Sequence, residues 1–210
     1  HYWGKRTTAD FNTAIECFQS AIKRDPNYAA AYAGMANTYA LMGGYSYEPQ
    51  GPYIEKARQA AQRALEIDPR SADAHVALAV IAQNYDWDWP KAESEYRRAI
   101  ELDRDYAPAY ASLTVAYFEK NRLHADSQWT KQAVQSAAHA LQLNSDLADS
   151  HVAAGVAAML AGRNSQAEQE FRKAADLDPK NATPHRWLGL LFNTMGKSKQ
   201  AEEEMTRAVA

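Results

Sequence analysis

Residues 148–181 read ADSHVAAGVAAMLAGRNSQAEQEFRKAADLDPKN, and this 34-residue stretch decides the fold because its pattern recurs along the chain. Its second half carries Ala167, then Phe171 four residues later and Ala174 three residues further on. Offsets of 0, 4 and 7 place side chains on one face of an α-helix. The sequence therefore predicts a recurring helix with a shared small and apolar face. The other copies begin at Ala14, Ala57, Ala92, Ala133 and Ala201.

A second helix precedes each of these helices. In residues 148–181 it carries His151, Ala154, Gly155 and Ala158, and the offsets of 0, 3, 4 and 7 again mark a single helical face. A small residue beside a large one allows two helices to approach closely. The corresponding sets elsewhere are Tyr32, Met35, Ala36 and Tyr39; His75, Leu78, Ala79 and Ala82; Tyr110, Leu113, Thr114 and Tyr117; and His185, Leu188, Gly189 and Phe192.

This paired pattern resembles the tetratricopeptide repeat, a 34-residue helix-turn-helix unit with W-x2-L-G-x2-Y in its first helix and A-x3-F and a late Pro in its second. The resemblance covers essentially the whole chain and implies an all-α fold. We expect a single domain over residues 1–210, a right-handed α-solenoid of about six units whose first and last are incomplete. Truncated ends of this kind would expose apolar surface and offer a route to self-association. The predicted units are about 1–28, 29–71, 72–106, 107–147, 148–181 and 182–210.

The second helix of a unit is expected to stop at its late proline. Pro26, Pro69 and Pro179 hold that position in three units, whereas Arg104 and Ser145 replace proline in two others. These two units have kept the preceding Leu-Asp or Leu-Asn pair.

The composition excludes several functional classes. The 210 residues are 46% hydrophobic with a net charge of −3, and acidic and basic residues are mixed along the chain. A nucleic-acid-binding surface normally shows as a basic stripe, and an anionic membrane would require a polybasic run. The longest uncharged apolar stretch, residues 152–162, is far shorter than the roughly 20 residues that span a bilayer. Cys17 is the single cysteine, so neither an internal disulfide nor a cysteine-based zinc site can form.

Tyr85, Asp86, Trp87, Asp88 and Trp89 combine aromatic and acidic side chains, as sugar-cleaving sites do. A glycosidase, however, needs two carboxylates that face each other across a cleft, and adjacent turn residues share no such cleft. We instead expect Asp88 to cap the following helix, with a proline tolerated in the first helical turn. The chain also lacks G-x-S-x-G, H-E-x-x-H and a phosphate-binding glycine loop. No catalytic residue and no cofactor are predicted, and the chain is expected not to be an enzyme.

Three histidines, His75, His151 and His185, occupy one repeat position and could suggest a metal array. Tyr32 and Tyr110 hold the same position in two other units. The position therefore favours a half-buried ring with one polar atom, and no metal site is predicted.

In the tetratricopeptide family the first helices of successive units line a concave groove, and ligands contact a fixed set of their positions. The resemblance implies a mostly apolar groove with a few amides, suited to a peptide or helix of a protein partner. The chaperone-binding carboxylate clamp is incomplete, because Ala33 stands where its lysine is expected. The alternative is that the groove valines pack only against one another. The predicted groove residues are Asn37, Leu41, Val76, Val80, Gln83, Asn84, Val115, Phe118, Val152, Val156, Met159, Arg186 and Asn193.

A second candidate surface lies at the turns that join the two helices of each unit. Aromatic residues gather there, and exposed aromatics are enriched at interfaces. They could equally pack the longer turns, because such large rings are rarely left in water. The residues concerned are Tyr45, Tyr47, Tyr53, Tyr85, Trp87, Trp89 and Trp129.

The combination of YWGKRT at residues 2–7 with YDWDW at residues 85–89 looks like the C-terminal tetratricopeptide regions of large bacterial signalling proteins. Those proteins attach the repeats to a winged-helix, serine/threonine kinase or nucleotide cyclase domain. The resemblance implies a cytoplasmic or periplasmic piece of a longer bacterial protein, as does a chain that opens at His1 without an initiator Met.

Three functions remain open from the sequence. The first is a non-catalytic scaffold or sensory module that binds a protein or peptide partner and contacts neither nucleic acid nor membrane directly. The second is a small-ligand sensor that regulates an attached output domain, such as a transcription factor or a kinase. The third is a subunit domain of an enzyme whose active site lies elsewhere.

Overall fold

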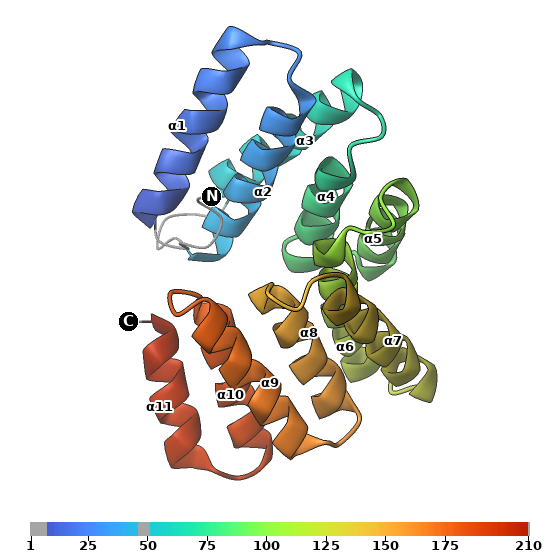
Figure 1. The fold of residues 1–210 in the computed structure, drawn as a ribbon, viewed down its shortest axis with the longest axis vertical. Coiled ribbons are helices and arrows are strands. Elements are labelled where there is room, and N and C mark those ends of the chain that lie inside the picture. The colour runs from blue at the N-terminus through green and yellow to red at the C-terminus, as the bar shows by residue number, and fades with distance from the viewer. Residues whose placement is uncertain (1–7, 46–50, 210) are drawn as a thin grey trace. The chain divides into compact units, whose positions relative to one another are not determined.

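The computed structural model describes the backbone of residues 8–45 and 51–209 and the side chains of residues 10–42 and 51–209. Within these ranges every regular element is an α-helix, and consecutive helices run antiparallel as hairpins (Figure 1). The predicted all-α fold of paired helices is therefore confirmed. The helices are α1 (Thr8–Arg24), α2 (Ala29–Tyr45), α3 (Gly51–Ile67), α4 (Ala72–Asn84), α5 (Trp89–Leu102), α6 (Ala107–Leu123), α7 (Ser127–Leu143), α8 (Ala148–Leu160), α9 (Asn164–Leu177), α10 (Ala182–Thr194) and α11 (Ser198–Val209).

The chain divides into two compact units, residues 1–109 and 110–210, close to the boundary predicted between the third and fourth repeats. In the first unit α2 packs against α1, α3 and α4, and α4 packs against α5. In the second unit α8 packs against α7, α9 and α10, and α10 packs against α11. Most of these contacts join helices adjacent in sequence, and α2–α4 and α8–α10 bring successive first helices together. Whether residues 1–210 behave as one domain stays a prediction.

Small residues in the first helices set the distance between paired helices. A Cβ atom on Gly155 of α8 would lie 2.4 Å from the Phe171 ring of α9. A Cβ atom on Gly189 of α10 would lie 2.8 Å from the Met205 side chain of α11. Both distances are shorter than carbon atoms tolerate, so glycine is what admits the large side chain, as the pattern predicts.

The repeat alanines form the inner face of the second helices. All six that open the pattern are buried, and Tyr96 and Phe171, four residues after theirs, are fully buried as well. Met205 holds the same position in the last unit, where its side chain lies against Gly189 while 44% of its surface is exposed. The six alanines are Ala14, Ala57, Ala92, Ala133, Ala167 and Ala201.

The second helices end two residues before the late proline position whether or not a proline is present. In α5 the backbone N–H of Asp105 donates to Asp103 Oδ1 at 3.0 Å, and in α7 that of Asp146 donates to Asn144 Oδ1 at 3.0 Å. The same hydrogen bond follows α1 and α3, where prolines are present. An Asp or Asn side chain that bonds the backbone two residues on forms a turn and competes with the helix. The retained Asp or Asn therefore explains why two units stop without proline.

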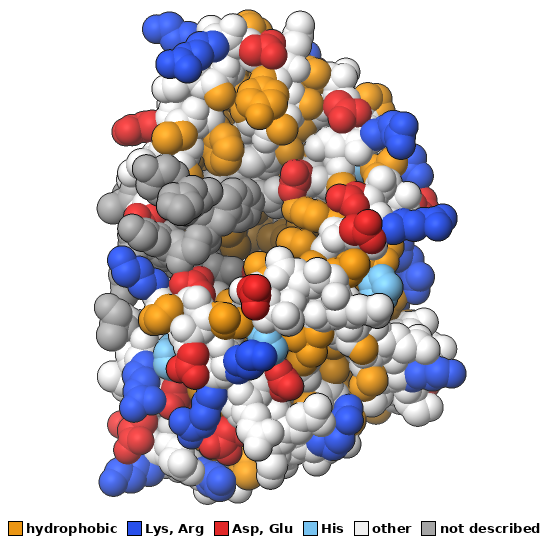
Figure 2. Space-filling model, viewed as in Figure 1, with side chains coloured by type: hydrophobic (Ala, Val, Ile, Leu, Met, Phe, Trp, Pro, Cys, Tyr) orange, Lys and Arg blue, Asp and Glu red, His pale blue; other side chains and the backbone are white. Residues whose placement is uncertain are grey.

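No helix in the described ranges is both long enough and apolar enough to cross a bilayer. On the face shown in Figure 2, acidic and basic side chains are intermixed rather than sorted by sign.

Candidate functional site

The predicted groove residues of α2 and α4 are mostly buried. Asn37 is only 6% exposed, and its Nδ2 donates to the carbonyl oxygens of Ala33 at 3.2 Å and Asp73 at 3.0 Å. Asp73 lies in α4, so Asn37 joins two successive first helices. The amide is already used by the fold, which leaves it little capacity to hold a partner's carboxylate.

The other groove residues in the first compact unit differ in how far they reach the surface. Val76 and Gln83 are buried, Leu41 and Val80 are half-buried, and Asn84 is exposed. Gln83 Nε2 donates to Asn84 Oδ1 at 3.3 Å, while Gln83 Oε1 is buried and accepts no hydrogen bond from any residue that the structure describes. A buried acceptor without a donor is costly, and at this depth Gln83 Oε1 is not accessible to a partner.

In the second compact unit, Phe118 of α6 and Val152 and Val156 of α8 are buried in one cluster with Leu188 of α10. Val115 and Met159 are partly buried against this cluster, whereas Arg186 and Asn193 of α10 are exposed.

Trp187, which the sequence analysis did not single out, extends this cluster. Its ring lies edge-on to Phe118 at 5.0 Å and is stacked on Phe171 at 6.1 Å. The predicted groove is thus a half-buried apolar strip with exposed polar residues beside it, and a binding role for it remains a prediction.

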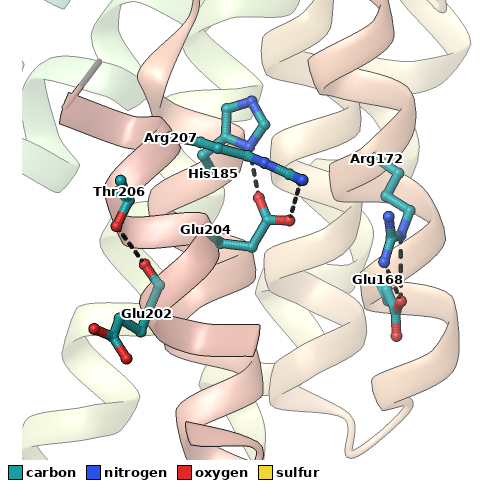
Figure 3. A network of polar contacts seen from close by, with 7 residues as sticks. All are labelled: Glu168, Arg172, His185, Glu202, Glu204, Thr206 and Arg207. Atoms are coloured by element: carbon teal, nitrogen blue, oxygen red, sulfur yellow. Dashed lines mark hydrogen bonds and ion pairs between the residues drawn. The ribbon is translucent and has the colours of Figure 1, made fainter. Parts of the chain in front are cut away.

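Each of the three repeated histidines pairs with a glutamate on the second helix of its own hairpin. The distances from Nδ1 to Oε2 are 2.7 Å for His75–Glu95, 2.7 Å for His151–Glu170 and 2.6 Å for His185–Glu204. In the last pair Glu204 also accepts from Arg207 Nη1 at 2.8 Å (Figure 3). These pairs bond the two helices of a hairpin to each other at one fixed level.

His151 makes a second polar contact, between Nε2 and the carbonyl oxygen of Ser145 at 2.9 Å. Both ring nitrogens therefore face oxygen acceptors.

The glutamate partners were missed, although the sequence held a signal for them. Glu95, Glu170 and Glu204 each lie three residues after the first alanine of the pattern. The two units with a tyrosine in place of the histidine carry Ala60 and Ser136 at that position. His therefore occurs with Glu, and Tyr with a small residue. Among the residues that the structure describes, no three His, Cys, Asp or Glu side chains gather as a metal site would require.

Most of the aromatic residues at the turns pack locally. Tyr53 is half-buried against a cluster that includes Ile54. The Trp129 ring is stacked on Tyr117 at 6.0 Å, with Lys120 Nζ 3.8 Å from its centre. The predictions for Tyr45 and Tyr47 fall outside the described side chains.

Trp87 is the exception at these turns. It is 66% exposed, and its backbone has a φ of 56°, a left-handed conformation that bulky residues rarely adopt. Gly162 and Gly196 hold the same repeat position with φ values of 71° and 72°. The Trp87 ring lies edge-on to the Trp89 ring, with 6.0 Å between the ring centroids. Trp87 thus stands where other units use glycine.

The turn around Trp87 is otherwise ordinary. Asp88 caps α5 by accepting from the backbone N–H of Lys91 at 3.0 Å, and Pro90 lies in the first turn, as predicted. Asp86 forms an ion pair with Arg58. Asp86 and Asp88 are thus each engaged in a separate local contact.

Three tyrosines are held in their neutral form. Burial raises the pKa of Tyr85 to about 12, and its hydroxyl donates to the Ala40 carbonyl oxygen at 2.7 Å. Burial also raises the pKa of Tyr39. Burial and the charge of Asp73, to which the Tyr106 hydroxyl donates, raise the pKa of Tyr106.

Two segments of the chain match known repeat families. Residues 10–43 match the family described as TPR repeat, and residues 148–181 match the one described as Tetratricopeptide repeat. Both segments are therefore similar to tetratricopeptide repeats. The second match has the same bounds as the stretch that decided the fold from sequence.

Several known proteins are similar over part of their length. A 112-residue segment is 32% identical to the probable UDP-N-acetylglucosamine–peptide N-acetylglucosaminyltransferase SPINDLY of Hordeum vulgare, covering 50% of this chain and 11% of that protein. An 81-residue segment is 37% identical to the type IV pilus assembly protein PilF of Pseudomonas aeruginosa, covering 39% of this chain and 32% of that protein. The chain thus spans a small part of these two relatives.

Among solved structures, a thermophilic TPR protein of Thermus thermophilus, TTC0263, superposes with a TM-score of 0.67 at 21% identity, covering 83% of this chain and 90% of that one. This likeness shows the fold. Proteins with tetratricopeptide repeats generally mediate protein–protein interaction.

Proposed function

We propose that this chain is a non-catalytic scaffold that binds a segment of a partner protein along its first helices. The observation that carries the proposal is the packing of α8 against α10. These helices bring half-buried Met159 and Leu190 onto one strip with exposed Arg186 and Asn193. Apolar side chains that reach the surface beside a cation and an amide suit a polypeptide, which presents both apolar side chains and backbone polar groups.

The chemistry of the strip favours shape and backbone recognition over capture of a terminal carboxylate. Met side chains adapt to irregular apolar partners. Exposed amides such as those of Asn84 and Asn193 can donate to and accept from a peptide backbone. By contrast, Asn37 is committed to Ala33 and Asp73, and Ala33 is fully buried. A clamp for a chain end therefore lacks its groups.

The proposal is tested by affinity capture with the chain as bait. We expect Arg186→Glu combined with Asn193→Ala to lose partner recovery while the thermal melt stays unchanged, because both residues are exposed. The matched control changes Gln169→Ala and Lys173→Glu, which are exposed on the second helix α9. Equal recovery by the parent, the groove variant and the control variant would refute a groove on the first helices.

We also propose, as the alternative, that the chain senses a small ligand for an attached output domain. This role is supported by the resemblance of residues 2–7 and 85–89 to repeat regions of bacterial signalling proteins. A ligand that binds only the folded chain raises its melting temperature. Thermal-shift screening against small metabolites would favour sensing if one compound stabilised the chain, and a uniformly unresponsive screen would leave the scaffold function preferred.

A further inference from the structure

A trough in the first compact unit lies away from the predicted groove. Its floor is α2, with Tyr32, Met35 and Tyr39, and its walls are α1 and α3. The trough is broadly open to solvent, with a volume of about 550 Å³. On α3 the lining residues Lys56, Gln59, Ala60 and Arg63 have offsets of 0, 3, 4 and 7, so the trough runs along that helix.

The unit that holds the trough lacks the histidine–glutamate pair. Ala60 holds the position at which Glu95, Glu170 and Glu204 reach across to a histidine in other units. Here a methyl group replaces the carboxylate, and Tyr32 replaces the histidine. The side-chain volume and the negative charge that a glutamate supplies in the other units are therefore both absent beside Ala60.

The same replacement leaves the trough positively charged. Its lining includes Lys23, Lys56 and Arg63 and, among the described residues, no carboxylate. Arg207 has the repeat position of Arg63 and is neutralised within its site by Glu204 at 2.8 Å. Arg63 pairs instead with Glu66 at 2.8 Å, a surface pair in which 45% and 63% of the two side chains are exposed. Exposed pairs contribute little, so an incoming carboxylate can replace Glu66.

The spacing of the cations indicates what fits. Lys56 and Arg63 are seven residues apart, which is about 10 Å along a helix axis at 1.5 Å per residue. In a polyproline II segment, side chains three residues apart share one face and lie about 9 Å apart. Such segments also dock in grooves lined with aromatic side chains, and the half-buried Tyr32 lies on this floor.

We infer that the trough binds an acidic, proline-containing extended segment of a partner polypeptide. Its two carboxylates, three residues apart, meet Lys56 and Arg63, and the residues between them lie on Tyr32 and Met35. The site is separate from the groove of the first helices, so either can operate without the other.

The test is a fluorescence-polarisation titration of the chain with a labelled Gly-Glu-Pro-Leu-Glu-Gly amide. We expect saturable binding that weakens as salt is added, because it depends on exposed charges. Lys56→Glu combined with Arg63→Glu should weaken binding at least about tenfold, the effect of losing about 1.4 kcal/mol. Ala60→Glu should do the same by restoring the carboxylate of the other units.

The chain offers a matched control for this variant. Lys91 and Arg98 of α5 hold the repeat positions of Lys56 and Arg63, with Glu95 between them. Lys91→Glu combined with Arg98→Glu should leave binding within about twofold, although it changes the net charge equally. A second peptide with the two glutamates adjacent should bind more weakly than the first.

Three results would overturn the inference: no saturation by the first peptide, equal losses in the two charge-reversal variants, or equal binding of the two peptides. Thermal melts accompany each variant. If Ala60→Glu fails to fold, the exposed Lys56 and Arg63 changes decide the question alone.

Discussion

Trp87 shows how much one residue can depart from the pattern of its repeat. A non-glycine residue in the left-handed region costs roughly 1–2 kcal/mol. At 66% exposure the ring returns little of this through burial. A residue kept at a structural cost is a candidate for function, and an exposed tryptophan is a common anchor at interfaces.

We predict that Trp87→Gly is more stable than Trp87→Ala by about 1 kcal/mol, because both lose the ring but only glycine relieves the backbone. Chemical denaturation of the two variants measures this difference. Gly162→Ala is the reciprocal control and should lose about 1 kcal/mol, since its φ is 71°. If both Trp87 variants lost several kcal/mol equally, the ring would be a packing residue.

The pair of His151 and Glu170 gives a prediction about coupling. Removal of one partner leaves the other unsatisfied in a site where the histidine side chain is only 4% exposed. We expect Glu170→Ala alone to cost about 1–3 kcal/mol. His151→Tyr combined with Glu170→Ala recreates the combination of Tyr32 and Ala60 and should cost less than the sum of its single changes.

A double-mutant cycle measured by urea unfolding gives the coupling, which we expect to be at least about 0.5 kcal/mol. Glu168→Ala is the control, because its pair with Arg172 (Figure 3) leaves 27% and 52% of the two side chains exposed and is worth about 0.5 kcal/mol. If the losses in the free energy of unfolding from the His151 and Glu170 changes were strictly additive, the two side chains would not stabilise each other.

At the scale of the helix, the turn after α5 allows the contribution of the Asp103 side chain to ending the helix to be measured separately from that of a proline at position 104. Asp103→Ala removes the acceptor for the Asp105 N–H and should cost about 1 kcal/mol. Arg104→Pro should be tolerated or stabilise by about 0.4–1 kcal/mol, because the preceding residue is already extended with a φ of −136° and a ψ of 102°. Differential scanning calorimetry compares the two variants. A greater loss from Arg104→Pro would mean that proline does not suit this turn.

Tyr85 connects the end of α4 to α2 and makes that contact sensitive to alkali. The unfolded chain releases this proton near pH 10, whereas the folded chain holds it to about pH 12. Between these values the unfolded state binds fewer protons, so the free energy of unfolding falls as pH rises. The stabilisation is fully present below about pH 10 and is lost toward pH 12.

We therefore expect Tyr85→Phe to lose stability at neutral pH, by about 1 kcal/mol for its hydrogen bond, and to decline less steeply than the parent in alkali. Urea unfolding at a series of pH values gives both slopes. Tyr28→Phe, at a 47% exposed site, should keep the parent slope. If the free energy of unfolding fell equally steeply with pH for Tyr85→Phe and the parent, Tyr85 would not be the source of the alkaline loss of stability.

The helices themselves were predictable, because small and apolar residues at offsets of 0, 4 and 7 mark one buried helical face. The cap formed by Asp88 and the position of Gly155 opposite Phe171 could also be predicted, since both follow from local helix geometry. The burial of Asn37 was not. Its partner Asp73 lies in another helix, and a polar residue in a first helix looks the same in sequence whether it faces a ligand or bonds the neighbouring backbone. Glu95, Glu170 and Glu204 could have been found by comparing the units with one another.

At the scale of the molecule, contacts are made mainly between neighbouring helices, and the chain forms two compact units. Stability in such chains is a sum of local terms, so regions can open separately. Phe171 is fully buried in the second unit and Ile81 in the first. Phe171→Ala should cost about 3–5 kcal/mol and Ile81→Ala about 2–5 kcal/mol.

We predict that Phe171→Ala accelerates amide hydrogen exchange in α8–α11 and leaves α2–α4 protected, and that Ile81→Ala has the opposite effect. Hydrogen exchange followed by mass spectrometry resolves the two regions. Uniform acceleration across residues 8–209 by either change would show that the chain unfolds as one cooperative body.

The histidine–glutamate pairs also limit how such a chain can be lengthened by gene duplication. Each pair is completed inside one hairpin, so copying a whole hairpin carries both halves along. A recombination crossover between its two helices could instead set a carboxylate against a tyrosine, or a histidine against a methyl group. The heritable unit of this array is therefore the hairpin, and its internal turn is the junction least suited to splicing.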